Sequence, residues 1–495
     1  MFSCISNIKG FGAYCKLRHW RELGVGMKRL VFCFDGTWNK LAADSPTNVV
    51  LLAEMTKPIA SDGTPQLIYY DEGIGTAKDE RFRGGAFGKG MMDNIRDAYR
   101  FLLFNYEPGD HIFAFGFSRG AFTARSFVGF IRHAGILNVD SAKEIEEAIG
   151  LYKAVFKGDG DDSLDALIFR SQYSSQICVS EWDKDWRQEN CSDMDWRDVP
   201  ILQIKYIGVW DTVAALGCPK FIPGATWINR KFKFHDAKLT SKVQAARHAV
   251  AIDERRVLFE PVLWNNVADL NTDQDWSMYD PHAPYQQKWF PGVHGSVGGG
   301  GPERGLSDAT LAWVLKGARA QGLEVRNGPE SRAYEISPNH LAPLQNDPEV
   351  ARSANSLIGK LKSAMLSSDR VGPNDIVQVS ASARRRWNAE PSAGRGAAAY
   401  RPKTLGAVAS RMTVLGVDAE GSDDEIALVH PVVRGDTLGK LAAKYLGNKN
   451  RYDEIFNLNR DQLDDPDDIF VGMALKIPPD HLTGNGAGGG DHVTD

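Results

Sequence analysis

The sequence predicts an α/β fold: a mostly parallel sheet flanked by helices, followed by a small second domain. Short, almost continuous apolar runs occur at Arg29–Phe34, His111–Phe117 and 201–210, as expected for strands that are covered on both faces. Between the first two runs, apolar residues recur at helical spacing through 91–106. Strands that alternate with helices in this way form parallel sheets.

The later elements follow from the same patterns. The segment after Phe117 continues at helical spacing to about 137, and 311–322 is predicted to be a helix that ends at Gly322. Residues 241–253 (SKVQAARHAVAID) are also predicted to be helical, with His248 packed in the core. From Ser331 to about 405 the pattern is weak.

The length of 495 residues predicts two or three structural units. An acidic stretch at 418–425 is typical of a solvated linker, and the glycines after 480 are typical of a disordered tail. The predicted organisation is an N-terminal extension at 1–26, a larger α/β domain at 27–405, a linker at 406–428, a compact unit at 429–479 and a tail at 480–495.

Composition excludes several classes of function. The net charge of -5 gives no reason to expect nucleic acid as a partner. The six cysteines show no C-x-x-C spacing, so neither a zinc site nor a disulfide framework is indicated, and no metal or organic cofactor is expected. No apolar run approaches the roughly 18 residues of a membrane-spanning helix, and the N-terminus lacks the apolar core of a signal peptide. A cytoplasmic location in the producing cell is therefore expected.

One motif predicts a nucleophile. Residues 116–120 read Gly-Phe-Ser-Arg-Gly, the G-x-S-x-G pattern of a strand-to-helix turn that exposes a serine. The pattern is weak alone, but here a buried strand precedes it and a helix follows. Gly116, Gly120 and Ala121 supply the small residues that strand and helix need to approach closely. Ser118 is therefore the predicted nucleophile; the alternative is a serine in a glycine-rich turn.

A serine hydroxyl needs a base and an orienting carboxylate. Asp211 follows the strand at 201–210, so it is predicted to lie at the carboxyl edge of the sheet. His294 precedes a glycine run that could let the imidazole swing over Ser118. The alternatives are that Asp211 caps a helix and that another of the eleven histidines is the base.

The oxyanion hole needs backbone N–H groups from two strand ends. The amide of Arg119 is the first predicted donor, and that of Gly36 or Thr37, directly after the first strand, is the second. Asp35 is expected to position this loop, although Asp35 and Thr37 could equally do no more than shape a turn.

Nine stretches carry a resemblance that spans about 27–405: RLVFCFDGTWN, TNVVLL, YYDEGIGT, GGAFGKGMMDNIRDAYRFL, FGFSRGAFTARSFVGFI, YIGVWDTVAALG, HAVAIDERR, GVHGSVGGG and YRPKTL. Together they resemble a known family, the α/β-hydrolases that include type VI secretion phospholipase effectors. This resemblance implies an esterase triad of Ser118, Asp211 and His294, and cleavage of phospholipid acyl esters. Members often have Ser-Asp after the histidine, whereas Gly295 and Ser296 stand here.

The C-terminal unit resembles a LysM domain, with a strand, two helices and a strand in that order. The stretches that carry the resemblance are VVRGDTLGKLAAKYLG, RYDEIFNLNRD and GMALKIP. The resemblance implies binding of N-acetylglucosamine glycans such as peptidoglycan through the loop of Gly435, Asp436 and Thr437. The alternative is that this unit docks on secretion machinery or another protein.

These expectations combine into a serine esterase or lipase for phospholipids that is tethered to cell wall. The resemblance also implies delivery to the periplasm of a target cell by type VI secretion, with secretion-system proteins as partners. The stretch 219–235 mixes aromatic and basic residues, which suits peripheral contact with an anionic membrane, although such a stretch is more often packed. The alternatives are a catalytically inactive glycan-binding adaptor and a cytosolic esterase for small esters.

Overall fold

A computed structural model describes most of the chain. The extension at 1–26, Thr37, the stretch 219–235, the acidic linker and the tail after 479 lie outside the described residues. The described residues are 27–36, 44–73, 86–155, 163–192, 194–213, 238–280, 282–326, 336–346, 367–389, 399–412, 428–446, 448–459, 463 and 465–477.

The larger domain is built on a six-stranded sheet with the order β2-β1-β3-β4-β5-β6. Every neighbouring pair in it is parallel, so the predicted α/β class is confirmed, and the three apolar runs form strands. The strands are β1 (Arg29–Phe34), β2 (Gln66–Asp71), β3 (His111–Phe117), β4 (Ile204–Trp210), β5 (Val243–Ala251) and β6 (Tyr285–Phe290).

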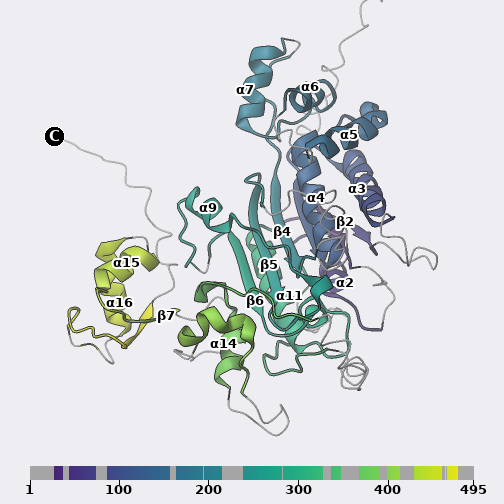
Figure 1. The fold of residues 1–495 in the computed structure, drawn as a ribbon. Helices are drawn as coiled ribbons and strands as arrows, with labels where there is room; N and C mark the ends of the chain where they lie inside the picture. Colours follow the sequence, from purple (N-terminus) through teal and green to yellow (C-terminus); the bar gives the residue numbers. More distant parts are fainter. Residues whose placement is uncertain are drawn as a thin grey trace, which may run out of the picture.

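Apolar side chains alternate between the two faces of the sheet and build two cores. Helices lie over both cores (Figure 1). In β1, Leu30 and Phe32 point into the core beneath α3 (Ala86–Asn105), α4 (Arg119–Ala134) and α5 (Ile145–Val155). Val31 and Cys33 point into the other core, beneath α2 (Asn48–Met55) and α11 (Gly305–Ala320). Helices thus cover both faces, as expected for continuous apolar strands.

The segment at 241–253 is a strand, not the predicted helix. Residues Val243–Ala251 form β5, an inner strand of the sheet that lies between β4 and the edge strand β6. A strand that is buried on both faces presents small and apolar residues without a period of two, so its pattern can resemble that of a buried helix. His248 is nonetheless fully buried, as predicted.

Shorter elements complete the larger domain. Helices α6 (Leu164–Tyr173) and α7 (Glu181–Asn190) lie at the top of Figure 1, and α9 (Val267–Thr272), α10 (His294–Gly298) and α14 (Ala381–Asn388) lie around β5 and β6. The packed part of the larger domain continues beyond residue 405, where this domain was predicted to end. The 3-10 helix η5 (Lys403–Arg411) buries Val408, and Met412 follows it in the same core, so packing extends into the predicted linker.

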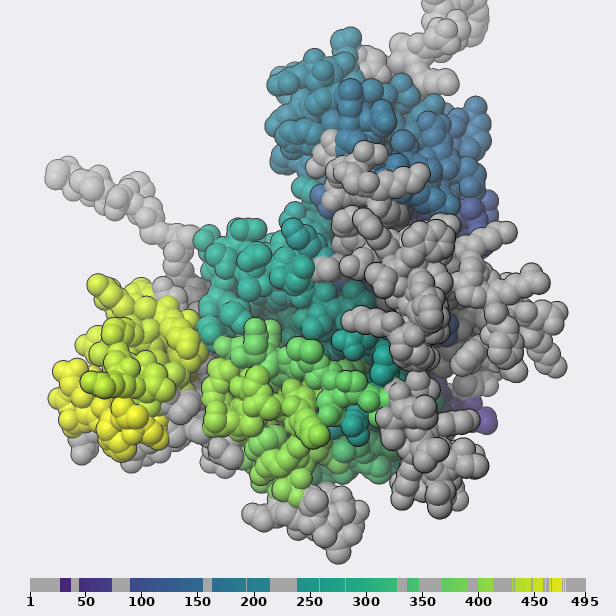
Figure 2. All heavy atoms as spheres, in the orientation of Figure 1, coloured from purple at the N-terminus to yellow at the C-terminus, as the bar shows by residue number. Residues whose placement is uncertain are grey.

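The C-terminal unit has the predicted strand-helix-helix-strand order. It consists of β7 (Leu428–Pro431), α15 (Leu438–Leu446), α16 (Tyr452–Leu458) and β8 (Ala474–Ile477), with β7 and β8 antiparallel. It forms a lobe of its own beside the larger domain (Figure 2). The two units touch through the rings of Tyr279 and Tyr445, whose centroids are 4.8 Å apart.

Candidate active site

Ser118 occupies a strained turn between β3 and α4. Its φ of 59° lies in the left-handed region, which residues other than glycine rarely adopt. A Cβ at Gly116 would lie 2.5 Å from the Gly120 carbonyl oxygen, and a Cβ at Gly120 would lie 2.2 Å from that of Phe34. The two glycines therefore allow strand and helix the close approach that the motif predicts.

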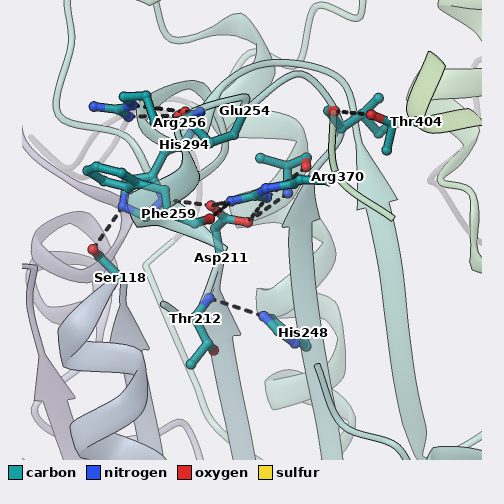
Figure 3. Close-up of polar contacts among 12 residues, drawn as sticks. Ser118, Asp211, Thr212, His248, Glu254, Arg256, Phe259, His294, Arg370 and Thr404 are labelled. Atoms are coloured by element: carbon teal, nitrogen blue, oxygen red, sulfur yellow. Dashed lines mark hydrogen bonds and ion pairs between the residues drawn. The ribbon is translucent and has the colours of Figure 1, made fainter. Parts of the chain in front are cut away.

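Three residues from three strand ends meet at the carboxyl edge of the sheet (Figure 3). The hydroxyl oxygen of Ser118 lies 2.8 Å from Nε2 of His294. On the other side of the imidazole, Nδ1 lies 2.6 Å from Oδ2 of Asp211. A carboxylate accepts, so Nδ1 carries the proton and Nε2 is left to accept the proton of the Ser118 hydroxyl.

Asp211 is held at the end of β4 in a second strained conformation, with φ 37°. Its carboxylate is fully buried and accepts two hydrogen bonds from the guanidinium of Arg370, at 2.6 and 2.9 Å. Burial alone would raise the pKa of Asp211, but Arg370 and His294 hold that pKa well below its usual value. Asp211 is therefore ionised at neutral pH.

Aromatic rings fix the orientation of the imidazole. The rings of Phe117 and Phe259 lie 4.6 and 4.8 Å from that of His294, centroid to centroid. The backbone N–H of His294 donates to Glu254 at 3.3 Å. Burial would raise the pKa of Glu254, yet its hydrogen bonds from Arg256 lower it. Glu254 is thus the acidic side chain that contacts the backbone of His294.

His248 supports the site from beneath. Its Nε2 accepts the backbone N–H of Thr212 at 3.2 Å, and its Nδ1 lies 2.9 Å from Gln287 Oε1. Burial, with a contribution from Arg125, lowers the pKa of His248 to about 3. A neutral imidazole is required here because Nε2 must accept. His248 therefore holds the backbone of Thr212, the residue that follows Asp211.

The predicted oxyanion loop is only partly described. The backbone N–H of Gly36 donates to Asp35 Oδ1 at 2.6 Å. In this structure the predicted second oxyanion donor is therefore already hydrogen-bonded to a carboxylate. Oδ2 of Asp35 accepts from Thr47 at 2.7 Å and Tyr70 at 2.9 Å, which ties the end of β1 to its neighbours. Arg119 begins α4 directly after Ser118. Thr37 lies outside the described residues.

The glycine run after His294 serves packing. A Cβ at Gly298 would lie 2.0 Å from the ring of Phe117, and one at Gly299 would lie 2.9 Å from the backbone nitrogen of Asn48. Because His294 already lies at hydrogen-bonding distance from Ser118, the swing expected from this run is not needed.

In the C-terminal unit, the predicted glycan loop is shaped by its own side chains. Asp436 accepts from the backbone N–H of Val433 at 2.8 Å and contacts His430 Nε2 at 2.7 Å. The hydroxyl of Thr437 accepts the N–H of Lys440 at 3.2 Å and caps α15. Gly435, with φ 95°, makes the turn between them.

Among the described residues, no three His, Cys, Asp or Glu side chains are arranged to hold a metal ion. No helix in the described ranges is long and apolar enough to cross a bilayer.

Comparison with known proteins settles the family. Residues 28–317 match the model of the catalytic domain of Tle1-like type VI secretion phospholipase effectors. The chain belongs to this Tle1-like family. Residues 430–478 match the LysM domain model, so the Tle1-like catalytic domain is followed by a LysM domain.

The individual relatives are more distant. An uncharacterised Saccharomyces cerevisiae protein, YEL023C, is 29% identical over 248 residues, which are 47% of this chain and 32% of that protein. The potassium binding protein Kbp of Escherichia coli is 36% identical over 64 residues, which are 11% of this chain and 43% of Kbp. The chain therefore spans less than half the length of either curated relative.

Two solved structures share limited similarity with the Tle1-like chain. An uncharacterised protein from Pseudomonas aeruginosa is 17% identical, with a TM-score of 0.34, over 68% of this chain and 53% of that one. The Tle1 effector bound to the VgrG spike of a type VI secretion system is 18% identical, with a TM-score of 0.28, over 55% and 51%.

Sequence reasoning missed three residues beside the predicted triad. Glu254 and Phe259 lie in and just after the HAVAIDERR stretch, but nothing in their spacing indicates contact with His294. Arg370 lies in the weakly patterned region and beyond the residues that match the Tle1-like model. No local signal marks it, because its partner Asp211 is 159 residues away in the chain.

Proposed function

We propose that this protein is a serine esterase that hydrolyses the acyl esters of phospholipids. The observation that carries the proposal is the unbroken hydrogen-bond chain from Ser118 through His294 to Asp211, with distances of 2.8 and 2.6 Å. Membership of the Tle1-like family supports phospholipids as the substrate class.

In the proposed reaction, the Ser118 hydroxyl oxygen attacks the acyl carbon while His294 Nε2 takes the proton. His294 then returns this proton to the departing alcohol, and water releases the acyl group by the same route. Asp211 keeps the proton on Nδ1 and stabilises the imidazolium that forms. The first step produces a covalent acyl-serine and the second a free fatty acid.

The negative oxygen of the intermediate is proposed to face the start of α4. The Arg119 amide is the first donor, and the helix dipole adds favourable charge there. Gly36 can be the second donor only if its N–H turns away from Asp35 Oδ1, a movement that substrate binding would have to drive. Thr37 remains the alternative second donor.

Two exposed apolar side chains stand next in sequence to residues near the site and suit a lipid surface. Val371 is 83% exposed and Val257 is 37% exposed. The two segments that carry them run side by side, because the Ser368 N–H donates to the Arg255 carbonyl at 2.8 Å. Exposed apolar side chains next to arginines favour peripheral contact with an anionic membrane.

For the LysM domain we propose binding of peptidoglycan-type glycan through the loop of Gly435, Asp436 and Thr437. Together with the Tle1-like family, this favours an effector that the producing cell holds in its cytoplasm and delivers through a type VI secretion system. Its destination would be the periplasm of a target cell, where cell wall and phospholipid are adjacent.

The decisive experiment is product analysis by mass spectrometry. Vesicles of mixed bacterial phospholipids are incubated with the wild-type chain and with Ser118→Ala. The proposal expects free fatty acid and lysophospholipid from the wild type alone. Equal products from both proteins, or release of head groups without fatty acid, would overturn it.

A further inference from the structure

We propose that Arg370 is a positioning residue of the hydrolytic site, which holds the Asp211 carboxylate in the orientation that His294 requires. This inference rests on the proposed function of the triad. It adds a residue from outside the part of the chain that matches the Tle1-like model, which ends at residue 317.

The carboxylate of Asp211 accepts a full set of hydrogen bonds. Oδ1 accepts from the Ala251 N–H at 2.9 Å and from Arg370 Nη1 at 2.6 Å. Oδ2 accepts from His294 Nδ1 at 2.6 Å and from Arg370 Nη2 at 2.9 Å. Since a carboxylate offers about four acceptor sites, it has no second orientation of equal energy. Arg370 supplies two of the four bonds.

Arg370 also joins the acid to the residue that packs on the base. Its Nη1 donates to the Ala251 carbonyl at 2.8 Å, and its Nη2 donates to the Phe259 carbonyl at 2.5 Å. The ring of Phe259 lies against the imidazole of His294. One planar guanidinium thus holds Ala251 at the end of β5, the Asp211 carboxylate and the backbone of Phe259 together. A lysine ammonium could not do this.

The segment that carries Arg370 is itself fastened to the larger domain. Ser367 forms a backbone bridge with Arg256, and Asp369 pairs with Arg255 at 2.9 Å. Arg370 is 5% exposed while the next residue, Val371, is 83% exposed. The chain therefore runs near the surface here and turns the Arg370 side chain inward to Asp211.

The arginine also secures the charge of Asp211. A buried carboxylate without a cationic partner would favour its protonated form, and the attraction of Arg370 opposes this. A protonated Asp211 could not accept the hydrogen bond from the Nδ1–H of His294 in the same way. The titratable groups around the pair are His294, His248, Glu254 and Glu260.

The test compares Arg370→Gln and Arg370→Lys with Arg187→Gln. Arg187 is a matched control because it is also buried and pairs with a buried aspartate, Asp183, at 2.9 Å, while its hydrogen bonds go to Asp183, Ser174 and Ile177 and not to the triad. For each variant, kcat and KM on a soluble ester are measured against pH, together with the melting temperature. Arg370→Gly is also assayed with added guanidinium ion.

We expect Arg370→Gln and Arg370→Lys each to lose about 10²-fold in kcat with little change in KM, as for a misplaced catalytic group. The acidic limb of the kcat/KM profile of Arg370→Gln moves to higher pH because Asp211 has lost its cationic partner, and millimolar guanidinium restores part of the activity of Arg370→Gly. Arg187→Gln lowers the melting temperature and keeps the wild-type pH profile.

Ser118→Ala separates the two claims. If this variant is inactive and Arg370→Gln keeps the wild-type kcat and pH profile, the role of Arg370 is refuted while the esterase stands. If the losses in the Arg370 variants only follow their melting temperatures, as in Arg187→Gln, the role is also refuted. An active Ser118→Ala overturns the proposed function itself.

Discussion

Nε2 of His294 lies 2.8 Å from the hydroxyl oxygen of Ser118, although 176 positions separate the two residues in the chain. The parallel sheet makes this contact possible, because each residue follows the carboxyl end of a strand. Ser118 and Asp211 both have positive φ, so the backbone is strained at two of the three positions. Strain of this kind is typical of sites that are built for function.

Asp211→Asn should nearly abolish turnover. An amide in place of the carboxylate no longer stabilises the imidazolium and favours the wrong tautomer of His294, so kcat should fall by about 10⁴-fold. The substitution also leaves the buried charge of Arg370 unpaired, which should cost about 3–5 kcal/mol in the free energy of unfolding. Steady-state kinetics and urea unfolding check the two effects, and a stability equal to that of the wild type would contradict the ion pair.

Gly120→Ala should disrupt the turn that carries Ser118. Its Cβ would lie 2.2 Å from the Phe34 carbonyl oxygen and 2.3 Å from that of Asp35, so β1 or α4 must move. We expect a loss of about 1–3 kcal/mol of stability together with most of the activity. The matched control is Gly150→Ala in α5, where nothing lies within 4 Å of the added Cβ. That variant should be as stable as the wild type or more so. Similar melting curves for both would contradict the packing argument.

His248 should give the protein a pH-dependent stability. Its pKa is lowered to about 3 in the folded chain, whereas an unfolded histidine takes up a proton near pH 6.5. Below that pH the unfolded state binds more protons, so the contribution of neutral His248 is complete above about pH 6.5 and is lost as the pH falls toward 3.

Replacement of the His248 imidazole should therefore make the free energy of unfolding less dependent on pH. Between pH 6 and pH 4, the free energy of unfolding of His248→Gln should fall less steeply than that of the wild type, by about 1.4 kcal/mol per pH unit. Urea unfolding at several pH values measures both slopes. Parallel slopes would mean that His248 is charged in the folded protein.

Asp436→Ala should impair the LysM domain alone. The substitution removes the hydrogen bond that closes the loop at Val433 and the contact with His430. We expect retention on insoluble peptidoglycan to drop at least about tenfold, in line with the loss of charge-assisted bonds, while hydrolysis of a soluble ester is unchanged. The control is Asp453→Ala on the exposed side of α16. Equal retention of the two variants would argue against this loop as the glycan site.

Much of this arrangement could be predicted from local patterns. The apolar runs at β1, β3 and β4 identify strands, and the small residues around Ser118 indicate the tight turn that the structure contains. The predicted places of Ser118 and Asp211 at the carboxyl edge of the sheet follow from their positions directly after apolar runs. These inferences work because each depends on a few adjacent residues.

The remainder depends on contacts between distant residues. Arg370 has no pattern of its own, since its importance comes from Asp211, 159 positions earlier. The helix predicted over 241–253 was wrong because a strand buried on both faces lacks the alternation that distinguishes strands. The Gly36 amide, predicted as an oxyanion donor, is engaged by the neighbouring Asp35 carboxylate, a detail of backbone direction that sequence spacing does not contain.

The most direct test of the central claim is the site and rate of labelling by a fluorophosphonate, which reacts only with an activated serine. Peptide mass spectrometry should locate the adduct on Ser118, with a rate that falls at least about 10³-fold in His294→Ala because the base is gone. An unlabelled Ser118, or a labelling rate that is the same in His294→Ala, would contradict the assignment.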